Sequence, residues 1–122
     1  MRSTAFHIAI LTFISACASS SRAAHRDAVV GSYVWGDEVN EFRPCGSDSV
    51  FWVLAKPELI TRLRLAHDSM TTRPYEKIYV SIQGHRSSKP ADGFAEQTNG
   101  YFEITAILEM RPLRKGECGV AA

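Results

Sequence analysis

Short apolar stretches alternate with turn-forming residues along most of this chain, a pattern typical of a small β-rich domain. Residues 29–35 and 39–42 are rich in β-branched and aromatic side chains, so we predict a strand in each. Gly36-Asp37 lies between them and predicts a turn. Residues 50–54 (VFWVL) form a continuous apolar run, which is consistent with a third strand buried on both faces.

Residues 57–70 show instead the spacing of an amphipathic helix. Pro57 and Glu58 are typical of a first helical turn. Apolar residues recur at spacings of three and four and define one face: Leu59, Ile60, Leu63, Ala66 and Met70. The polar residues expected to point largely away from that face are Arg62, Arg64, His67 and Asp68.

Two further segments alternate between apolar and polar residues, as half-buried strands do. In residues 77–83, Ile78, Val80 and Ile82 share one face. In residues 101–110 the predicted inward face is Phe102, Ile104, Ala106, Leu108 and Met110. Residues 84–99 contain Gly, Ser, Pro and Asp and predict a long loop, which ends at the turn signal Asn99-Gly100.

The predicted order is three strands, one helix and two strands. This order is that of a mainly β, five-stranded OB-type barrel with a helix between strands 3 and 4. Closure would hide the strand edges that a small open sheet exposes. The alternative is an α+β sheet with one covering helix. We place this OB-like domain at residues 29–118, followed by a tail at 119–122.

The first residues have the layout of a secretory signal. Met1-Arg2 supplies a positive charge, and residues 5–14 form an apolar run that is too short to span a bilayer. The segment Ile14-Ser15-Ala16-Cys17 resembles the lipobox of bacterial lipoprotein precursors.

The lipobox resemblance implies that residues 1–16 are removed and that Cys17 receives a lipid anchor. Several acyl chains together give stable membrane attachment. Residues 17–28 would then form the lipidated cysteine and a flexible tether. Cleavage after Ala18 or Ala23 is the alternative and would release a soluble periplasmic protein.

The cysteine count fits this interpretation, because an odd cysteine in a secreted protein needs an explanation. Lipidation uses Cys17, and Cys45 and Cys118 remain for a disulfide in an oxidising compartment. Two unpaired thiols or a metal site are the alternatives, and the spacing does not favour a metal site.

Charge argues against a nucleic-acid partner. The chain has 14 Lys and Arg against 13 Asp and Glu, and Arg2 is the only one of these within residues 1–16. The mature protein is therefore close to neutral, whereas nucleic-acid modules usually carry a strongly basic face.

Some positions resemble the C-terminal OB-fold domain of NlpE-type envelope lipoproteins. They are Gly31-Ser32-Tyr33, Phe42 followed by Cys45, the segment 80–85 (VSIQGH) and the near-terminal Cys118. The resemblance implies an OB fold, a Cys45–Cys118 disulfide and a link to envelope stress or surface sensing. This chain has no C-x-x-C motif, so a copper or redox role that depends on that motif does not carry over.

Candidate binding residues lie on the predicted strands and turns. We expect a ligand face that includes Trp35, Asp37, Tyr79 and His85. Basic residues that could flank it are Arg43, Arg73, Lys77, Arg86 and Lys89. His67 and His85 could meet Asp37, Glu38 or Asp92 around a metal, but no spacing requires this, and we predict no metal site.

The serines show no G-x-S-x-G elbow, and we predict no catalytic residues and no cofactor. We therefore expect a non-enzymatic envelope lipoprotein that binds an envelope protein or a glycan. Ala18 lacks the aspartate associated with inner-membrane retention, which favours the outer membrane facing the periplasm. The alternative function is a small periplasmic protein that binds copper or zinc.

Overall fold

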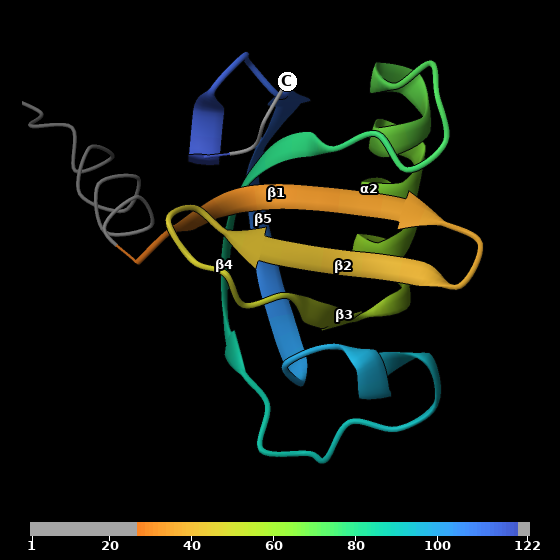
Figure 1. Cartoon of the computed structure of the whole chain (residues 1–122), viewed down its shortest axis with the longest axis vertical. Helices are drawn as coiled ribbons and strands as arrows, with labels where there is room; N and C mark the ends of the chain where they lie inside the picture. The colour runs from red at the N-terminus through yellow and green to blue at the C-terminus, as the bar shows by residue number, and fades with distance from the viewer. Residues whose placement is uncertain (1–26, 120–122) are drawn as a thin grey trace, which may run out of the picture.

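In the computed structural model, which describes residues 27–119, five strands close into a barrel (Figure 1). The elements are β1 (Val29–Gly36), β2 (Val39–Pro44), β3 (Phe51–Ala55), α2 (Pro57–Met70), β4 (Ile78–Arg86), the 3-10 helix η1 (Gly93–Gln97), β5 (Tyr101–Pro112) and the 3-10 helix η2 (Glu117–Gly119). The predicted signal, the lipid site at Cys17 and most of the tether and tail lie outside the described residues.

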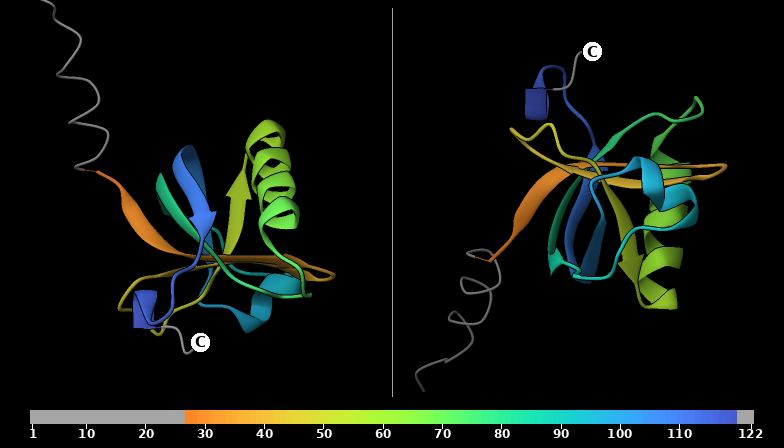
Figure 2. Two further views of the ribbon diagram at one scale, coloured as in Figure 1. Left: turned by 90° about the horizontal axis from the view of Figure 1, so that it is seen from above. Right: turned by 60° about the horizontal axis from the view of Figure 1, so that its bottom comes forward.

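The strand order around the barrel is β1-β2-β3-β5-β4. All neighbours are antiparallel except β3 and β5, which pair in parallel. The barrel closes where Val29–Tyr33 of β1 pairs with β4. The predicted OB-type barrel, with its helix between strands 3 and 4, is confirmed, and the open α+β sheet is wrong because the two edge strands pair with each other (Figure 2).

The core lies inside the barrel and beneath α2. Its buried members are Tyr33, Phe42, Phe51, Val53, Leu63, Ile78, Val80, Ile82, Phe102, Ile104 and Ile107. The predicted inward face of β4 is confirmed, since Ile78, Val80 and Ile82 are all fully buried. At Gly31 an added Cβ would lie 2.2 Å from the Arg43 carbonyl oxygen, so this close approach of β1 to β2 requires glycine.

Strand β3 differs from its prediction. Phe51 and Val53 are buried, but Trp52 and Leu54 are only half-buried. The outer face of β3 is therefore partly open, because both of these residues line a cleft instead of packing under a second layer.

Strand β5 also departs from simple alternation. The register with β4 shifts twice, between Ser81 and Ile82 and between Gln83 and Gly84. Each shift inserts one unpaired residue into β5 and reverses the side that the following residues face. Ile107 is consequently buried, whereas Ala106 and Leu108, which we predicted to face inward, are half-buried.

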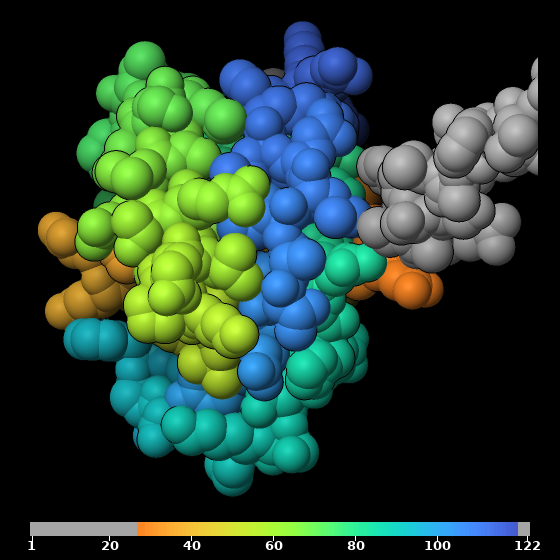
Figure 3. Space-filling view, turned by 180° about the vertical axis from the view of Figure 1, so that it is seen from behind, coloured from red at the N-terminus to blue at the C-terminus, as the bar shows by residue number. Residues whose placement is uncertain are grey.

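Helix α2 lies along β5 on the back of the barrel (Figure 3). Leu63 and His67 are its two buried residues, so the expectation that His67 points away from the apolar face is wrong. The reason is spacing, because His67 lies four residues after Leu63 and shares its side of the helix. Its ring meets the ring of Tyr33 edge-on, with centroids 6.2 Å apart.

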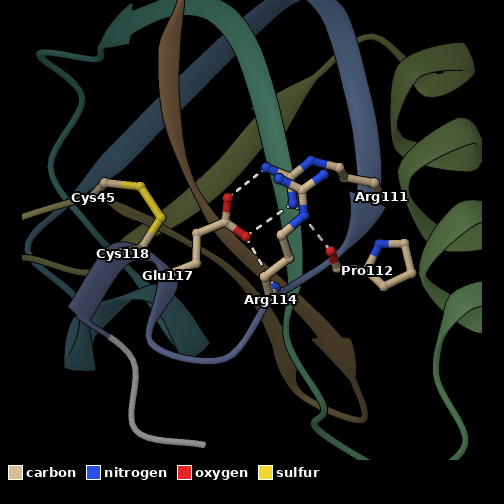
Figure 4. Close-up of a disulfide and its surroundings, with 6 residues drawn as sticks. All are labelled: Cys45, Arg111, Pro112, Arg114, Glu117 and Cys118. Carbon is tan, nitrogen blue, oxygen red and sulfur yellow. Dashed lines mark hydrogen bonds and ion pairs between the residues drawn. A yellow bond between two sulfur atoms is a disulfide. The ribbon is translucent and has the colours of Figure 1, made fainter.

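A disulfide between Cys45 and Cys118 joins the end of β2 to η2 (Figure 4). The two cysteines are 73 positions apart. Closing a loop of that length stabilises a fold by about 4 kcal/mol in the chain-entropy model. The disulfide thus ties the last described residues to the barrel.

Candidate functional site

Two hollows flank the tip of the β1–β2 hairpin and share Trp35, Gly36 and Asp37 as a common wall. We call the first the aromatic cleft; it holds about 520 Å³ and lies between the hairpin, β3 and η1. We call the second the histidine pocket; it holds about 420 Å³ and lies between the hairpin and the end of α2. Both volumes are in the range of small-ligand sites.

Three aromatic side chains from distant parts of the chain line the aromatic cleft: Trp35 of β1, Trp52 of β3 and Phe94 of η1. The rings of Trp52 and Phe94 stack with centroids 6.3 Å apart and planes at 23°. Phe94 is 59% exposed, so much of its ring is open to solvent. The cleft therefore presents an apolar, partly open ring surface.

The polar part of the cleft comes from the hairpin turn. Asp37 and Glu38 are exposed and line the cleft, and Glu38 has a φ of 57° in the left-handed region. No Lys or Arg is among its lining residues in the part of the chain that the structure describes. The cleft thus offers carboxylate acceptors and negative charge.

Asn40 forms the polar base of the cleft and is already hydrogen-bonded within the protein. The Tyr33 hydroxyl donates to Asn40 Oδ1 at 2.8 Å, and Asn40 Nδ2 donates to the Val53 carbonyl at 3.2 Å. Burial, followed by the nearby Asp68 carboxylate, raises the pKa of the Tyr33 phenol. This neutral network fixes β1, β2 and β3 relative to one another below the cleft.

The position of the aromatic cleft matches the usual ligand site of this fold. OB-folds bind oligonucleotides and oligosaccharides on the face of strands 2 and 3, between the β1–β2 and β4–β5 loops. Here the hairpin turn supplies Asp37 and Glu38, β3 supplies Trp52, and the β4–β5 connection supplies Phe94.

The four residues predicted to form one ligand face do not gather in the structure. Trp35 and Asp37 line the cleft, as expected of a binding face. Tyr79 instead lies under the Arg111 guanidinium, which is 3.7 Å from its ring centroid. His85 is exposed near the end of β4, with Nε2 3.5 Å from a Glu103 carboxylate oxygen. Both residues lie where β4 pairs with β5, opposite Arg111 and Glu103, and neither lines the cleft.

The basic residues proposed to flank the face are also dispersed. Arg43 and Lys77 line a separate hollow of about 60 Å³. Arg86 lies over Phe51 at 4.7 Å, and Lys89 over Tyr101 at 5.5 Å. Arg73 alone lines one of the two hollows, the histidine pocket.

Arg111 and Glu117 form the strongest ion pair near the disulfide (Figure 4). Two guanidinium nitrogens of Arg111 donate to the two carboxylate oxygens of Glu117, and the Arg114 amide donates to the same carboxylate at 2.9 Å. These bonds lower the pKa of Glu117 to about 2 and raise the pKa of Arg111. The pair holds the segment between the end of β5 and η2 in place and neutralises the charges of Arg111 and Glu117.

The two histidines of the described chain do not meet. His67 Nε2–H donates to the Glu76 carbonyl at 2.6 Å, and its Nδ1 has no hydrogen-bond partner among residues 27–119. In the same range no group of three or more His, Cys, Asp or Glu is placed to hold a metal ion. Copper or zinc binding therefore stays a prediction from sequence.

Sequence reasoning missed Phe94, Tyr75 and the pocket role of Asp68. A signal was present for Phe94, since an isolated aromatic residue in the polar segment Asp92-Gly93-Phe94 has no neighbouring strand pattern to bury it. Tyr75 and Asp68 gave no comparable signal, because their roles depend on how the end of α2 meets the hairpin.

No known protein family, curated protein or solved structure matches this chain. Among residues 27–119 no helix is long and apolar enough to cross a membrane. The resemblance to NlpE-type lipoproteins accordingly stays a prediction.

Proposed function

We propose that this chain is a bacterial envelope lipoprotein whose OB-type domain is a non-catalytic binding module for a glycan strand. The proposed envelope location rests on the apolar run and the lipobox that end at Cys17. Ala18 favours the outer membrane, with the domain facing the periplasm. The anchor would hold the domain within reach of the polymers and proteins of the envelope.

The chemistry of the aromatic cleft favours a glycan over the other polymers that OB-folds bind. Nucleic acid is polyanionic, and Asp37 and Glu38 would repel its phosphates. A sugar ring has an apolar face that packs against aromatic rings, and hydroxyl groups that donate to carboxylates. The cleft supplies both partners.

One observation carries the proposal: the stacked Trp52–Phe94 pair, in which Phe94 is exposed, lies where OB-folds bind extended ligands. An exposed Phe alone would be an ordinary surface feature. Its stacking on Trp52 beside two carboxylates makes a flat platform with polar edges, as a ring-shaped, hydroxyl-rich ligand requires.

The test uses a convenient property of the chain. Its only two tryptophans, Trp35 and Trp52, both line the aromatic cleft, so tryptophan fluorescence reports on that cleft directly. We expect an uncharged β-linked N-acetylglucosamine tetramer to change this fluorescence in a saturable titration. Phe94→Ala should weaken binding by roughly tenfold, as the loss of a central aromatic contact does.

Leu65→Ala is the matched control, because Leu65 is on α2 outside the cleft and has the same 59% exposure as Phe94. It should leave the affinity unchanged. A flat titration at millimolar sugar, or equal affinities for the wild type and Phe94→Ala, would overturn the glycan proposal.

A further inference from the structure

We propose that the histidine pocket is a second binding site, which takes the primary ammonium group of a ligand. It lies across the hairpin tip from the aromatic cleft, and its argument does not depend on the glycan proposal. The observations are an unsatisfied buried nitrogen, two carboxylates from different elements and two aromatic walls.

The buried nitrogen is Nδ1 of His67, a side chain that is 4% exposed. Because Nε2–H donates to the Glu76 carbonyl, the neutral ring carries its lone pair on Nδ1. The nearest charged atom is Asp68 Oδ1 at 3.6 Å, which is beyond hydrogen-bond distance. Two acceptors thus face each other with no donor between them.

A primary ammonium supplies the hydrogen-bond donors that His67 Nδ1 and the Asp68 carboxylate lack. It carries three N–H donors and one positive charge, so it can donate to His67 Nδ1 and to Asp68 together. Nδ1 is closed off from solvent in this structure. The Asp68 side chain is 61% exposed, so we expect it to turn outward into solvent and admit the donor.

The other residues that line the histidine pocket also suit an ammonium group. Asp37 from the hairpin turn adds a second carboxylate, and Trp35 and Tyr75 add ring faces that attract cations. Tyr75 has a φ of 59°, and a Cβ on Gly36 would lie 2.5 Å from its ring. The absence of a side chain at Gly36 leaves space for the Tyr75 ring, and the left-handed backbone of Tyr75 directs the ring there, so that it lines the pocket.

The basic residues nearby leave the pocket net negative. Arg73 lines the pocket, but its Nε lies 3.8 Å from the Glu76 carboxylate. That carboxylate also accepts the amide N–H groups of Thr72 and Arg73, which lower the Glu76 pKa. Arg64 packs over the ring of Trp35 at 5.8 Å and does not line the pocket. Neither arginine forms an ion pair with Asp37 or Asp68 within residues 27–119.

The ammonium could belong to a lysine side chain or to an amino sugar, and two matched probe pairs separate these sources. Nα-acetyl-lysine amide is compared with uncharged Nα-acetyl-norleucine amide, and glucosamine with uncharged N-acetylglucosamine. Each is titrated into the 15N-labelled protein, with the amide signals of His67, Asp68 and Tyr75 as the readout.

We expect saturable shifts of these three signals with at least one amine and none with its neutral partner; the amine that binds more tightly identifies the source. Asp68→Asn and Asp37→Asn should each weaken binding by about tenfold, the usual loss for one charge-assisted hydrogen bond. Asp48→Asn, an exposed carboxylate outside the pocket, should have no effect. Equal shifts from charged and neutral partners, or amine binding that survives both pocket substitutions, would overturn the proposal, whatever the tetramer does in the aromatic cleft.

Discussion

Glu117 shows how one carboxylate holds the end of this domain. Its two oxygens accept bonds from Arg111 and from the Arg114 amide, next to the Cys45–Cys118 disulfide. Arg111 in turn covers the ring of Tyr79. The last turn that the structure describes, η2, is therefore held by a charge network as well as by a covalent bond.

The lowered pKa of Glu117 predicts that the stability of the fold depends on pH. The folded value of about 2 lies below the ordinary value of 4.5. The carboxylate therefore stabilises the fold fully above pH 4.5, and this contribution is lost as pH falls towards about 2. We expect Glu117→Gln to lower the thermal midpoint near neutral pH, and the gap from wild type to close across this acidic window. Calorimetry of both proteins and of the exposed-site variant Glu96→Gln checks this; a gap that does not vary with pH would contradict it.

At the scale of elements, α2 is held to the barrel by a narrow stripe. Leu63 is fully buried, whereas Leu65, two residues later, is 59% exposed on the other side of the helix. The helix contacts β5, β3 and β1 through its buried side. Leu63 and Leu65 therefore lie in the same helix and differ mainly in how much of the side chain is buried.

This contrast predicts unequal costs for the same substitution. Leu63→Ala should destabilise the fold by about 2–5 kcal/mol, because it leaves a cavity in the core. Leu65→Ala should change stability by less than about 0.5 kcal/mol. Urea unfolding followed by tryptophan fluorescence measures both. Similar free energies of unfolding for the two variants would show that α2 is not anchored through Leu63.

Most of the fold could be predicted because each element has its own pattern. The inward face of β4 follows from a period of two, and the start of α2 from Pro57 and Glu58. The face of β5 could not be predicted, since a bulge depends on its partner strand. Next to the second bulge, a Cβ on Gly84 would lie 2.2 Å from the Glu103 carbonyl oxygen, a contact that no single strand reveals.

The candidate site was less predictable than the fold. Trp35 and Asp37 were anticipated, and both belong to the hairpin turn whose sequence signals are local. Tyr79 and His85 do not line the cleft with them, because an alternating pattern gives the face of a strand but not the position of a residue along the barrel. Phe94 reaches the cleft only through the long β4–β5 connection, whose path is set by the complete fold.

The predicted lipid anchor at Cys17 can be tested directly on the native protein. We expect native protein from a bacterial membrane fraction to begin at Cys17 and to carry acyl chains, as measured by intact mass. Cys17→Ser should appear in the soluble fraction, because several acyl chains give stable membrane attachment and none would remain. Cys45→Ser should keep the lipid. An unlipidated native chain that starts after Ala18 or Ala23 would contradict the anchor.

The disulfide has a mechanical consequence for a domain held by one end and loaded by its ligand. Force from the N-terminal side enters through β1 and passes along β2 to Cys45, where the covalent loop to Cys118 begins. A load between the anchor and a ligand held on η1 can therefore first draw out β1 and β2, or about 60 Å of extended chain. Beyond that point the cross-link passes the tension to the shorter arm of the loop, from Cys118 back through β5 to η1, so α2 and β4 on the longer arm are not drawn out.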